Sequence, residues 1–357
     1  MRIWGAFLKA ICAIAISCGA VVAVAQQPVT SSPAGIFQEP TAVAQPGAQP
    51  AANADTYVAS PESLAFGSSC GCGSTDACGC DTCDPCARDP LLGIILPTEQ
   101  CFCNFISPMT NPVYFEDPRN VSELRFIFLN HITPPALGAD SVRLLAMQFR
   151  AKLTERLSVI ATKDGFIMSD SPLLNDGWAD VNAGLKYLLY SDCETQTLLS
   201  AGLTYTLPTG SPRALQARGN GEFHAFLTGG TEIADNTHFI SASGFILPSN
   251  AAIQNKWFYW SNHLDRMILF DGFYAFGECN YYNYLSSARG FNAPVEGGDL
   301  FNLGSTGVAG HDLVTGAFGF KYKWNCWNEL GVAWEVPLTA RRGLLDNRLT
   351  ADYIIRW

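Results

Sequence analysis

The chain ends on the stretch RLTADYIIRW, residues 348–357. Alternate side chains of an extended strand point to opposite faces. One face of this stretch is apolar and carries Leu349, Ala351, Tyr353, Ile355 and Trp357. The other is polar apart from Ile354 and carries Arg348, Thr350, Asp352 and Arg356. The last strand of an outer-membrane barrel shows such an apolar face to lipid and a polar face to the lumen. The alternative is an ordinary edge strand that ends a soluble domain.

The aromatic end of this strand is itself informative. Tyr353, Ile355 and Trp357 resemble the C-terminal signal that the bacterial barrel-assembly machinery reads. The stretch therefore predicts two partners, the barrel-assembly machinery and the lipid of the outer membrane.

The same period-two alternation recurs upstream, in segments of about ten residues, as expected for strands that span a membrane. Such segments number about twelve, an even number, as is usual for single-chain bacterial barrels. They are 122–131, 141–153, 156–163, 179–190, 196–207, 222–233, 237–247, 257–268, 272–284, 312–324, 328–338 and 348–357.

The spacers between these segments favour a barrel over a soluble sandwich. Every spacer after an odd-numbered segment is longer than every spacer after an even-numbered one. Outer-membrane barrels have short periplasmic turns and long extracellular loops, whereas a sandwich has no reason to sort its loops in this way. We expect an all-β fold, a closed antiparallel transmembrane β-barrel of about twelve strands over residues 120–357.

Composition agrees with this fold and excludes some functions. Hydrophobic residues make up 48% of the chain and charged residues 15%, with no late apolar run long enough for a membrane helix. The net charge is −10, and −12 without the two cations Arg2 and Lys9. An acidic chain with no basic stripe argues against nucleic-acid partners.

The N-terminal part is organised differently. Residues 1–25 have the charged start, the apolar core and the Ala23-Val24-Ala25 site of a secretory signal peptide. An uncleaved helical anchor and lipidation at Cys18 are the alternatives. Residues 26–69 are rich in Ala, Pro and Gln and read as a disordered linker. The prediction is export to the outer membrane with the N-terminal segment in the periplasm.

A cysteine-rich segment follows at 70–119 and is expected to be periplasmic. In an oxidising compartment its cysteines favour disulfides, although their pairing cannot be read from the sequence. Zinc or an iron–sulfur cluster, free thiols and links between chains are the alternatives, and we predict no metal. The disulfide candidates are Cys70, Cys72, Cys78, Cys80, Cys83, Cys86, Cys101 and Cys103.

Several stretches resemble a known family. These are GWADVNAGLKYLLYSD at 177–192, LSAGLTYTLPTGSP at 199–212, the segment at 259–282 and the two closing strands. They look like the transporter-like outer-membrane barrels named after the meta-pathway of phenol degradation. The resemblance covers roughly 178–357 and implies a small-molecule channel, often one linked to hydrophobic or aromatic compounds. It does not identify the solute.

In a barrel, function depends on the side chains that face the lumen. Charged rings there select solutes in an open pore, but opposite charges can instead pair and plug a narrow barrel. The long spacer 285–311 either folds inward or forms a surface contact. The candidates for lining the lumen are Arg150, Lys186, Glu222, His224, Glu278, Lys321, Glu335, Asp352 and Arg356.

Other chemistry has less support. An interfacial girdle is favoured over a clamp for apolar solutes by a group of aromatic residues, Trp257, Phe258, Tyr259, Trp260, Tyr281, Tyr282 and Tyr284. The five histidines are dispersed, and no G-x-S-x-G motif is present, so we predict no enzyme and no cofactor. The working function is passive passage of small molecules. A structural barrel that anchors the envelope and a soluble extracellular β-sandwich that binds ligands are the rivals.

Overall fold

The computed structural model describes residues 90–171 and 174–357. The predicted signal peptide, the linker 26–69, Cys18 and the six cysteines between Cys70 and Cys86 lie outside the described residues. Within those ranges no helix is long and apolar enough to cross a membrane.

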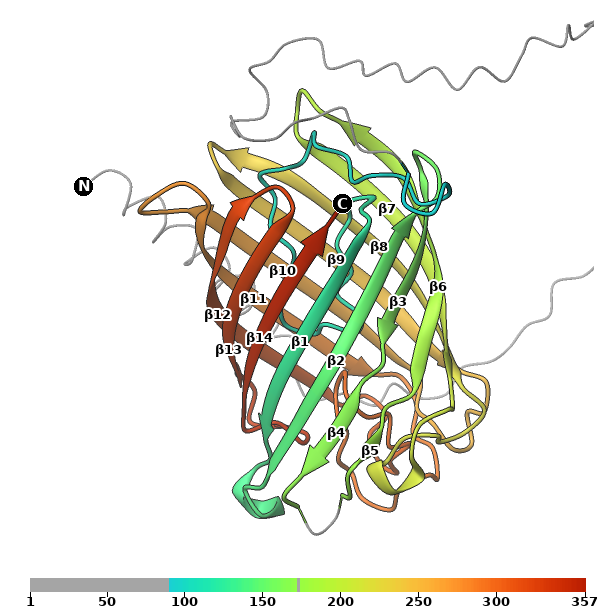
Figure 1. The fold of residues 1–357 in the computed structure, drawn as a ribbon. Helices are drawn as coiled ribbons and strands as arrows, with labels where there is room; N and C mark the ends of the chain where they lie inside the picture. Colours follow the sequence, from blue (N-terminus) through green and yellow to red (C-terminus); the bar gives the residue numbers. More distant parts are fainter. Residues whose placement is uncertain (1–89, 172–173) are drawn as a thin grey trace, which may run out of the picture. The chain divides into compact units, whose positions relative to one another are not determined.

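The described residues form one 14-stranded antiparallel sheet with two short 3₁₀ helices, η1 (Pro135–Leu137) and η2 (Pro212–Ala214) (Figure 1). The strands are β1 (Glu123–Ile132), β2 (Ser141–Lys152), β3 (Leu157–Lys163), β4 (Phe166–Ser169), β5 (Gly177–Trp178), β6 (Val181–Asp192), β7 (Thr197–Leu207), β8 (Glu222–Ala234), β9 (Thr237–Pro248), β10 (Trp257–Met267), β11 (Phe273–Tyr284), β12 (Asp312–Asn325), β13 (Asn328–Pro337) and β14 (Asn347–Arg356).

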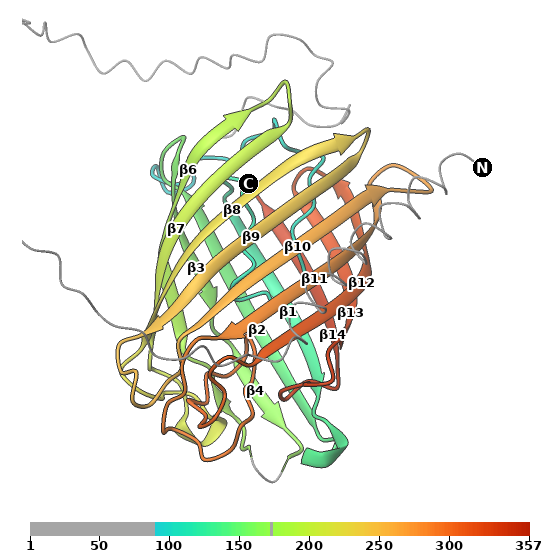
Figure 2. The same cartoon turned by 180° about the vertical axis from the view of Figure 1, so that it is seen from behind.

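The sheet closes on itself. β1 pairs with β14 on one side and with β2 on the other, and from β6 to β14 each strand pairs with the next in chain order. The short strands β3 and β4 both pair with β2 and share one wall position, and β5 and β6 share the next. The wall therefore has twelve positions, and the expected closed antiparallel barrel of about twelve strands is confirmed. Figure 2 shows the same closed wall from behind.

The spacer 164–178 differs from the expectation, because it is not all loop. It contains β4 and β5, which extend the wall beyond an interruption after Lys163. The chain bends there at Gly165, whose φ is +114° and whose added Cβ would lie 2.4 Å from the carbonyl oxygen of Leu145. The Asp164 carboxylate accepts a hydrogen bond from the Met147 amide at 2.8 Å, in place of a backbone hydrogen bond between strands. Four residues of strand after a glycine are too few to show alternation in sequence.

The two ends of the barrel differ as the spacers predicted. The short-turn end carries the turns 153–156, 193–196, 235–236, 268–272 and 326–327, together with Trp357. The long-loop end carries 133–140, 208–221, 249–256, 285–311 and 338–346, as well as the β4–β5 region.

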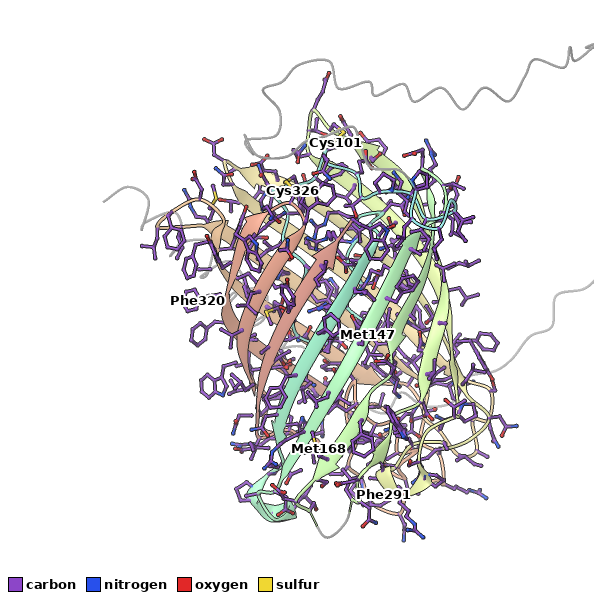
Figure 3. The ribbon with its side chains drawn as sticks, viewed as in Figure 1. Cys101, Met147, Met168, Phe291, Phe320 and Cys326 are labelled. Atoms are coloured by element: carbon purple, nitrogen blue, oxygen red, sulfur yellow. A yellow bond between two sulfur atoms is a disulfide. The ribbon has the colours of Figure 1, made fainter. Side chains whose placement is uncertain are left out.

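The outer face of the wall is apolar. Leu185, Leu203, Phe318 and Trp334 point outward and are 48–56% exposed. Phe320 points away from the wall in Figure 3. Burial alternates along most strands, as in β13, where every second residue is buried. An apolar exterior on a closed sheet is the arrangement that lets a barrel span a bilayer, since no backbone group is left unpaired in lipid.

Candidate functional site

The nine predicted lumen residues all point into the barrel. Each is at most 2% exposed, so none of them lines open water. Their burial has a cause that the sequence did not reveal, which is that the chain itself fills the lumen.

The filling piece is the lumen segment, residues 105–122. Every residue of it is buried. It enters the barrel at the short-turn end, runs into the lumen that the strands enclose, and returns to begin β1 at Glu123 (Figures 1 and 2). Its start and its end lie close together, since Arg119 donates to the Phe105 carbonyl at 2.8 Å. The Thr98 hydroxyl, in the chain before the segment, donates to the Ser122 carbonyl at 3.0 Å. We expected residues 70–119 to form a separate periplasmic segment, and for 105–119 that expectation is wrong. A short stretch without periodicity carries no strand or helix signal that would place it inside the barrel.

The wall holds the lumen segment through polar contacts at its deepest point. The Glu278 carboxylate accepts the backbone amides of Met109 at 2.7 Å and Thr110 at 2.6 Å. The Tyr114 hydroxyl donates to Glu222 at 3.1 Å. Two lumen candidates on β8 and β11, three wall positions apart, therefore bind the same inserted piece of chain.

The charges of the lumen segment meet opposite charges on the wall. Glu116 lies 2.6 Å from Arg150 and 2.8 Å from Lys186. Asp117 and Arg119, which follow it, pair with each other at 2.6 Å. A buried charge is tolerated only when it is paired and hydrogen-bonded, so these contacts explain why a charged lumen can be dry. The run EDPR at 116–119, in a chain with few charges, was the available signal.

An aromatic cluster holds the middle of the lumen segment. The Tyr114 ring lies edge-on to Trp257 at 4.9 Å and to His224 at 5.0 Å between centroids. The predicted girdle is therefore wrong for part of its residues. Trp257, Tyr259, Tyr282 and Tyr284 face inward and are buried, because each lies at an inward position of β10 or β11.

The loop 285–311 closes the lumen from the long-loop end. Asp299 pairs with Arg348 at 2.7 Å, and Asn302 donates to Glu222 at 2.9 Å. Leu300, Phe301 and Leu303 are buried in an apolar cluster with side chains of β1 and β2. The sequence left two possibilities for this loop, and in the structure it folds inward. A cavity of about 30 Å³ remains where the loop, the wall and the lumen segment meet.

The remaining candidates pair with opposite charges on the neighbouring strands β12, β13, β14 and β1. Arg356 lies 2.6 Å from Glu329, which lies 3.5 Å from Lys321. Lys321 is 3.0 Å from Asp352, and Arg125 of β1 is 2.7 Å from the same carboxylate. Glu335 pairs with Arg348 at 2.6 Å. Opposite charges therefore pair within the lumen, as the plugged alternative required.

Two histidines that looked dispersed in sequence form a buried chain with carboxylates. His238 lies 2.7 Å from Asp265, Asp265 lies 3.1 Å from His263, and His263 lies 2.7 Å from Glu278. Strand register makes these contacts, since Asp265 stands opposite His238 and His263 stands opposite Glu278. Sequence reasoning missed this group because the register of the pairs was unknown.

Two disulfides tie the chain just before the lumen segment to the barrel. Cys101 is bonded to Cys193 in the β6–β7 turn, and Cys103 is bonded to Cys326 in the β12–β13 turn. Cys193 and Cys326 were not among the candidates, which all lay N-terminal to the barrel. In the described ranges, one group has metal-ligand spacing, namely Glu99 with Cys101 and Cys193, and its two sulfurs are joined to each other.

The C-terminal residues lie where the N-terminal part crosses the rim. The Trp357 carbonyl accepts the Thr98 amide at 2.5 Å, and the Trp357 ring stacks on Phe149 at 6.3 Å between centroids. Ile355 points outward at 37% exposure, and the Tyr353 hydroxyl donates to Asn328 at 2.9 Å.

The closed wall, its apolar exterior and its charged interior define a class, a transmembrane β-barrel whose lumen is filled by its own chain. No family model matches the chain, and no curated protein matches it. Solved structures do resemble it. An outer membrane channel from Pseudomonas putida F1 is 14% identical, with 71% of this chain and all of that chain covered and a TM-score of 0.49. The KdgM porin (9% identity, 65% and 99% covered, TM-score 0.41) and the NanC porin (8%, 66% and 100%, 0.44) are also similar. At these scores the function has to be argued from the barrel itself.

Proposed function

We propose that the protein is a channel of the bacterial outer membrane for passive passage of small molecules, seen here in a closed state. The short-turn end then faces the periplasm, as short turns do in such barrels. The cysteine-rich N-terminal segment lies on the same side, and Tyr353, Ile355 and Trp357 serve as the signal for the barrel-assembly machinery. The proposal includes no catalytic step.

One observation carries the proposal, namely that the lumen is filled by an inserted piece of chain and not by the side chains of the wall alone. The lumen segment enters and leaves at the same end, so it can withdraw without threading through the barrel. Its contacts with the wall within 105–122 are ion pairs, hydrogen bonds and apolar packing. Eight-stranded barrels are filled by their own wall side chains, whereas twelve positions leave a space that here takes an extra segment.

The charged wall suits this role. Arg150, Lys186 and Glu278 bind the lumen segment now and would face water once it had left. A lumen with both signs of charge admits small polar and amphipathic solutes rather than one sign of ion. The family resemblance makes hydrophobic and aromatic compounds the first solutes to test.

A second function is favoured by the disulfides. A barrel joined covalently at two turns to its N-terminal segment could serve to anchor that segment, and whatever it binds, to the outer membrane. In that case the lumen would stay closed permanently.

Planar-bilayer recordings separate the two functions. The natural chain is compared with a variant in which residues 106–118 and 297–303 are both replaced by glycine–serine linkers of equal length, with all cysteines kept. A channel predicts small or rare openings for the natural chain and steady conductance for the variant. If the variant migrates as a folded barrel before boiling and is silent at every voltage, the channel proposal is refuted. Liposome swelling with sugars and aromatic acids then defines the solute.

A further inference from the structure

The two disulfides form a strap across the short-turn mouth of the barrel. Cys193 lies in the β6–β7 turn and Cys326 in the β12–β13 turn, and six of the twelve wall positions separate these turns in either direction. The turns therefore stand on opposite sides of the mouth. Cys101, Phe102 and Cys103 link them, so the strap is covalent from one side of the rim to the other. Figure 3 shows Cys101 and Cys326 at this end.

The strap lies where the lumen segment would have to leave. The segment begins two residues after Cys103 and is anchored at its other end by β1. Phe102 is 3% exposed and packs edge-on against Phe105 at 5.8 Å. The Gln196 amide donates to the Cys101 carbonyl at 3.0 Å, which ties the strap further to the β6–β7 turn. With both disulfides intact, the lumen segment has to pass this covalent link across the mouth in order to leave the barrel.

The two bonds differ in their access to solvent. Cys193 is exposed and Cys101 is partly exposed. Cys103 is 5% exposed and Cys326 is 4% exposed. Thiol–disulfide exchange requires a thiolate to reach a sulfur along the bond axis, so the first bond can be attacked in the folded protein and the second is shielded.

We propose that the Cys101–Cys193 disulfide is a redox site at which a dithiol releases the strap and so frees the lumen segment. One thiolate of the dithiol attacks the Cys193 sulfur, forms a mixed disulfide and expels the Cys101 thiolate, which takes up a proton. The second thiol of the reagent then closes its own disulfide and releases Cys193. Two electrons and two protons pass from the dithiol to the protein, and within residues 90–171 the strap then keeps its bond to Cys326. The chemical class of the partner is a dithiol, either small or carried by a protein.

The order of reduction is tested with dithiothreitol on the full chain in detergent. Free thiols are trapped with iodoacetamide and located by peptide mapping. Cys101 and Cys193 should be alkylated at about tenfold lower dithiothreitol than Cys103 and Cys326. Alkylation of all four at one concentration, or of Cys103 and Cys326 first, would overturn the proposal.

Release of the lumen segment is tested by hydrogen exchange. Peptides covering 105–115 should exchange about tenfold faster once the accessible bond is reduced. The paired variant C101S/C193S should show this fast exchange without reductant and should no longer respond to low dithiothreitol. The pair C103S/C326S should keep its response. Heat-modifiable migration on gels controls for folding, and unchanged exchange in a folded C101S/C193S variant would contradict the proposal.

This inference rests on the proposed channel for its biological meaning, but its test does not. If exchange rises on reduction and bilayers stay silent, the redox site stands and the channel fails. If conductance is present but neither it nor the exchange responds to dithiothreitol, the channel stands and the redox site fails.

Discussion

Arg356, the penultimate residue of the chain, lies 2.8 Å from Glu123, the first residue of β1. The two residues stand opposite each other in the register that closes the barrel. Both are buried, at 2% and 0% exposure. The seam between the first and last strands is therefore marked by opposite charges, which discriminate against a slipped register because a slip would separate this buried pair.

The first prediction concerns this seam. Arg356→Gln should destabilise the barrel by about 3–5 kcal/mol, because Glu123 and Glu329 both lose a buried partner. Urea unfolding in detergent, followed by gel mobility, measures the change. Arg143→Gln is the matched control, since Arg143 and its partner Asp170 are 45% and 59% exposed and should contribute less than about 1 kcal/mol. Equal effects of the two substitutions would contradict the assigned role of the seam.

A second prediction concerns Trp357. In cells, Trp357→Asp should leave most of the protein unassembled if the assembly machinery reads the aromatic end. Membrane fractionation and heat-modifiable migration measure assembly. Trp178→Asp is the control, because Trp178 is 63% exposed at the opposite end of the barrel and should leave assembly intact. Normal insertion of the Trp357 variant would refute the signal.

Glu116 gives a third prediction. Glu116→Gln removes the charge that pairs with both Arg150 and Lys186, and those two cations then repel each other in a dry lumen. Hydrogen exchange should rise in 105–122 while the wall strands stay protected, which separates loss of the segment from loss of the barrel. Glu155→Gln is the control, because Glu155 pairs with Lys152 but is 79% exposed. Equal loss of protection in wall and segment would argue against a separable segment.

A fourth prediction concerns the two segments that close the lumen, the lumen segment and the loop 285–311, either of which should be enough to block conductance. Replacing 297–303 by a glycine–serine linker removes the contacts of Asp299 and Asn302 with the wall. Conductance should stay low while the lumen segment is in place, because one closed gate is sufficient. With 106–118 also replaced, conductance should exceed that of either single variant. A large conductance from the loop variant alone would show that the lumen segment does not block the lumen.

A pH prediction follows from the loop carboxylate Glu296. Burial raises the pKa of Glu296, although the amides of Leu303 and Ser305 donate to its carboxylate. An acid whose pKa is raised on folding stabilises the fold below its unfolded pKa, and that stability is lost as pH rises through the raised value. Protection of peptides covering 296–305, corrected for intrinsic exchange, should therefore fall as the pH rises through the raised pKa of Glu296. Glu296→Gln should flatten this dependence, and Asp346→Asn should leave it unchanged.

Much of the wall could be predicted because its signal is local. Leu185, Leu203 and Trp334 alternate with polar or small neighbours, and lipid outside with protein inside enforces that alternation along each strand. The segment 257–268 alternates only weakly in sequence. β10 nevertheless forms at Trp257–Met267, next to a turn with Gly272 at φ +78°. Only the β4–β5 region was missed, since short strands after an interruption carry too few residues to alternate.

The lumen is a different case. Alternation alone placed Glu278 and Arg150 on the inward face, but it could not show that Met109 and Glu116 would meet them. Those contacts join residues that are far apart in sequence, and 105–122 has no period of its own. The partners of Cys101 and Cys103 depended in the same way on where the β6–β7 and β12–β13 turns come to lie.

By itself, then, the sequence determined the wall, its two faces, and the placement of short turns at one end and long loops at the other. The reason is that the alternation of side chains along a strand directly reflects which face meets lipid. Only the tertiary structure decided that the lumen is filled, which charges neutralise one another and which cysteines form the strap. Those outcomes depend on closure of the ring, which brings Arg356 beside Glu123 and encloses the lumen segment.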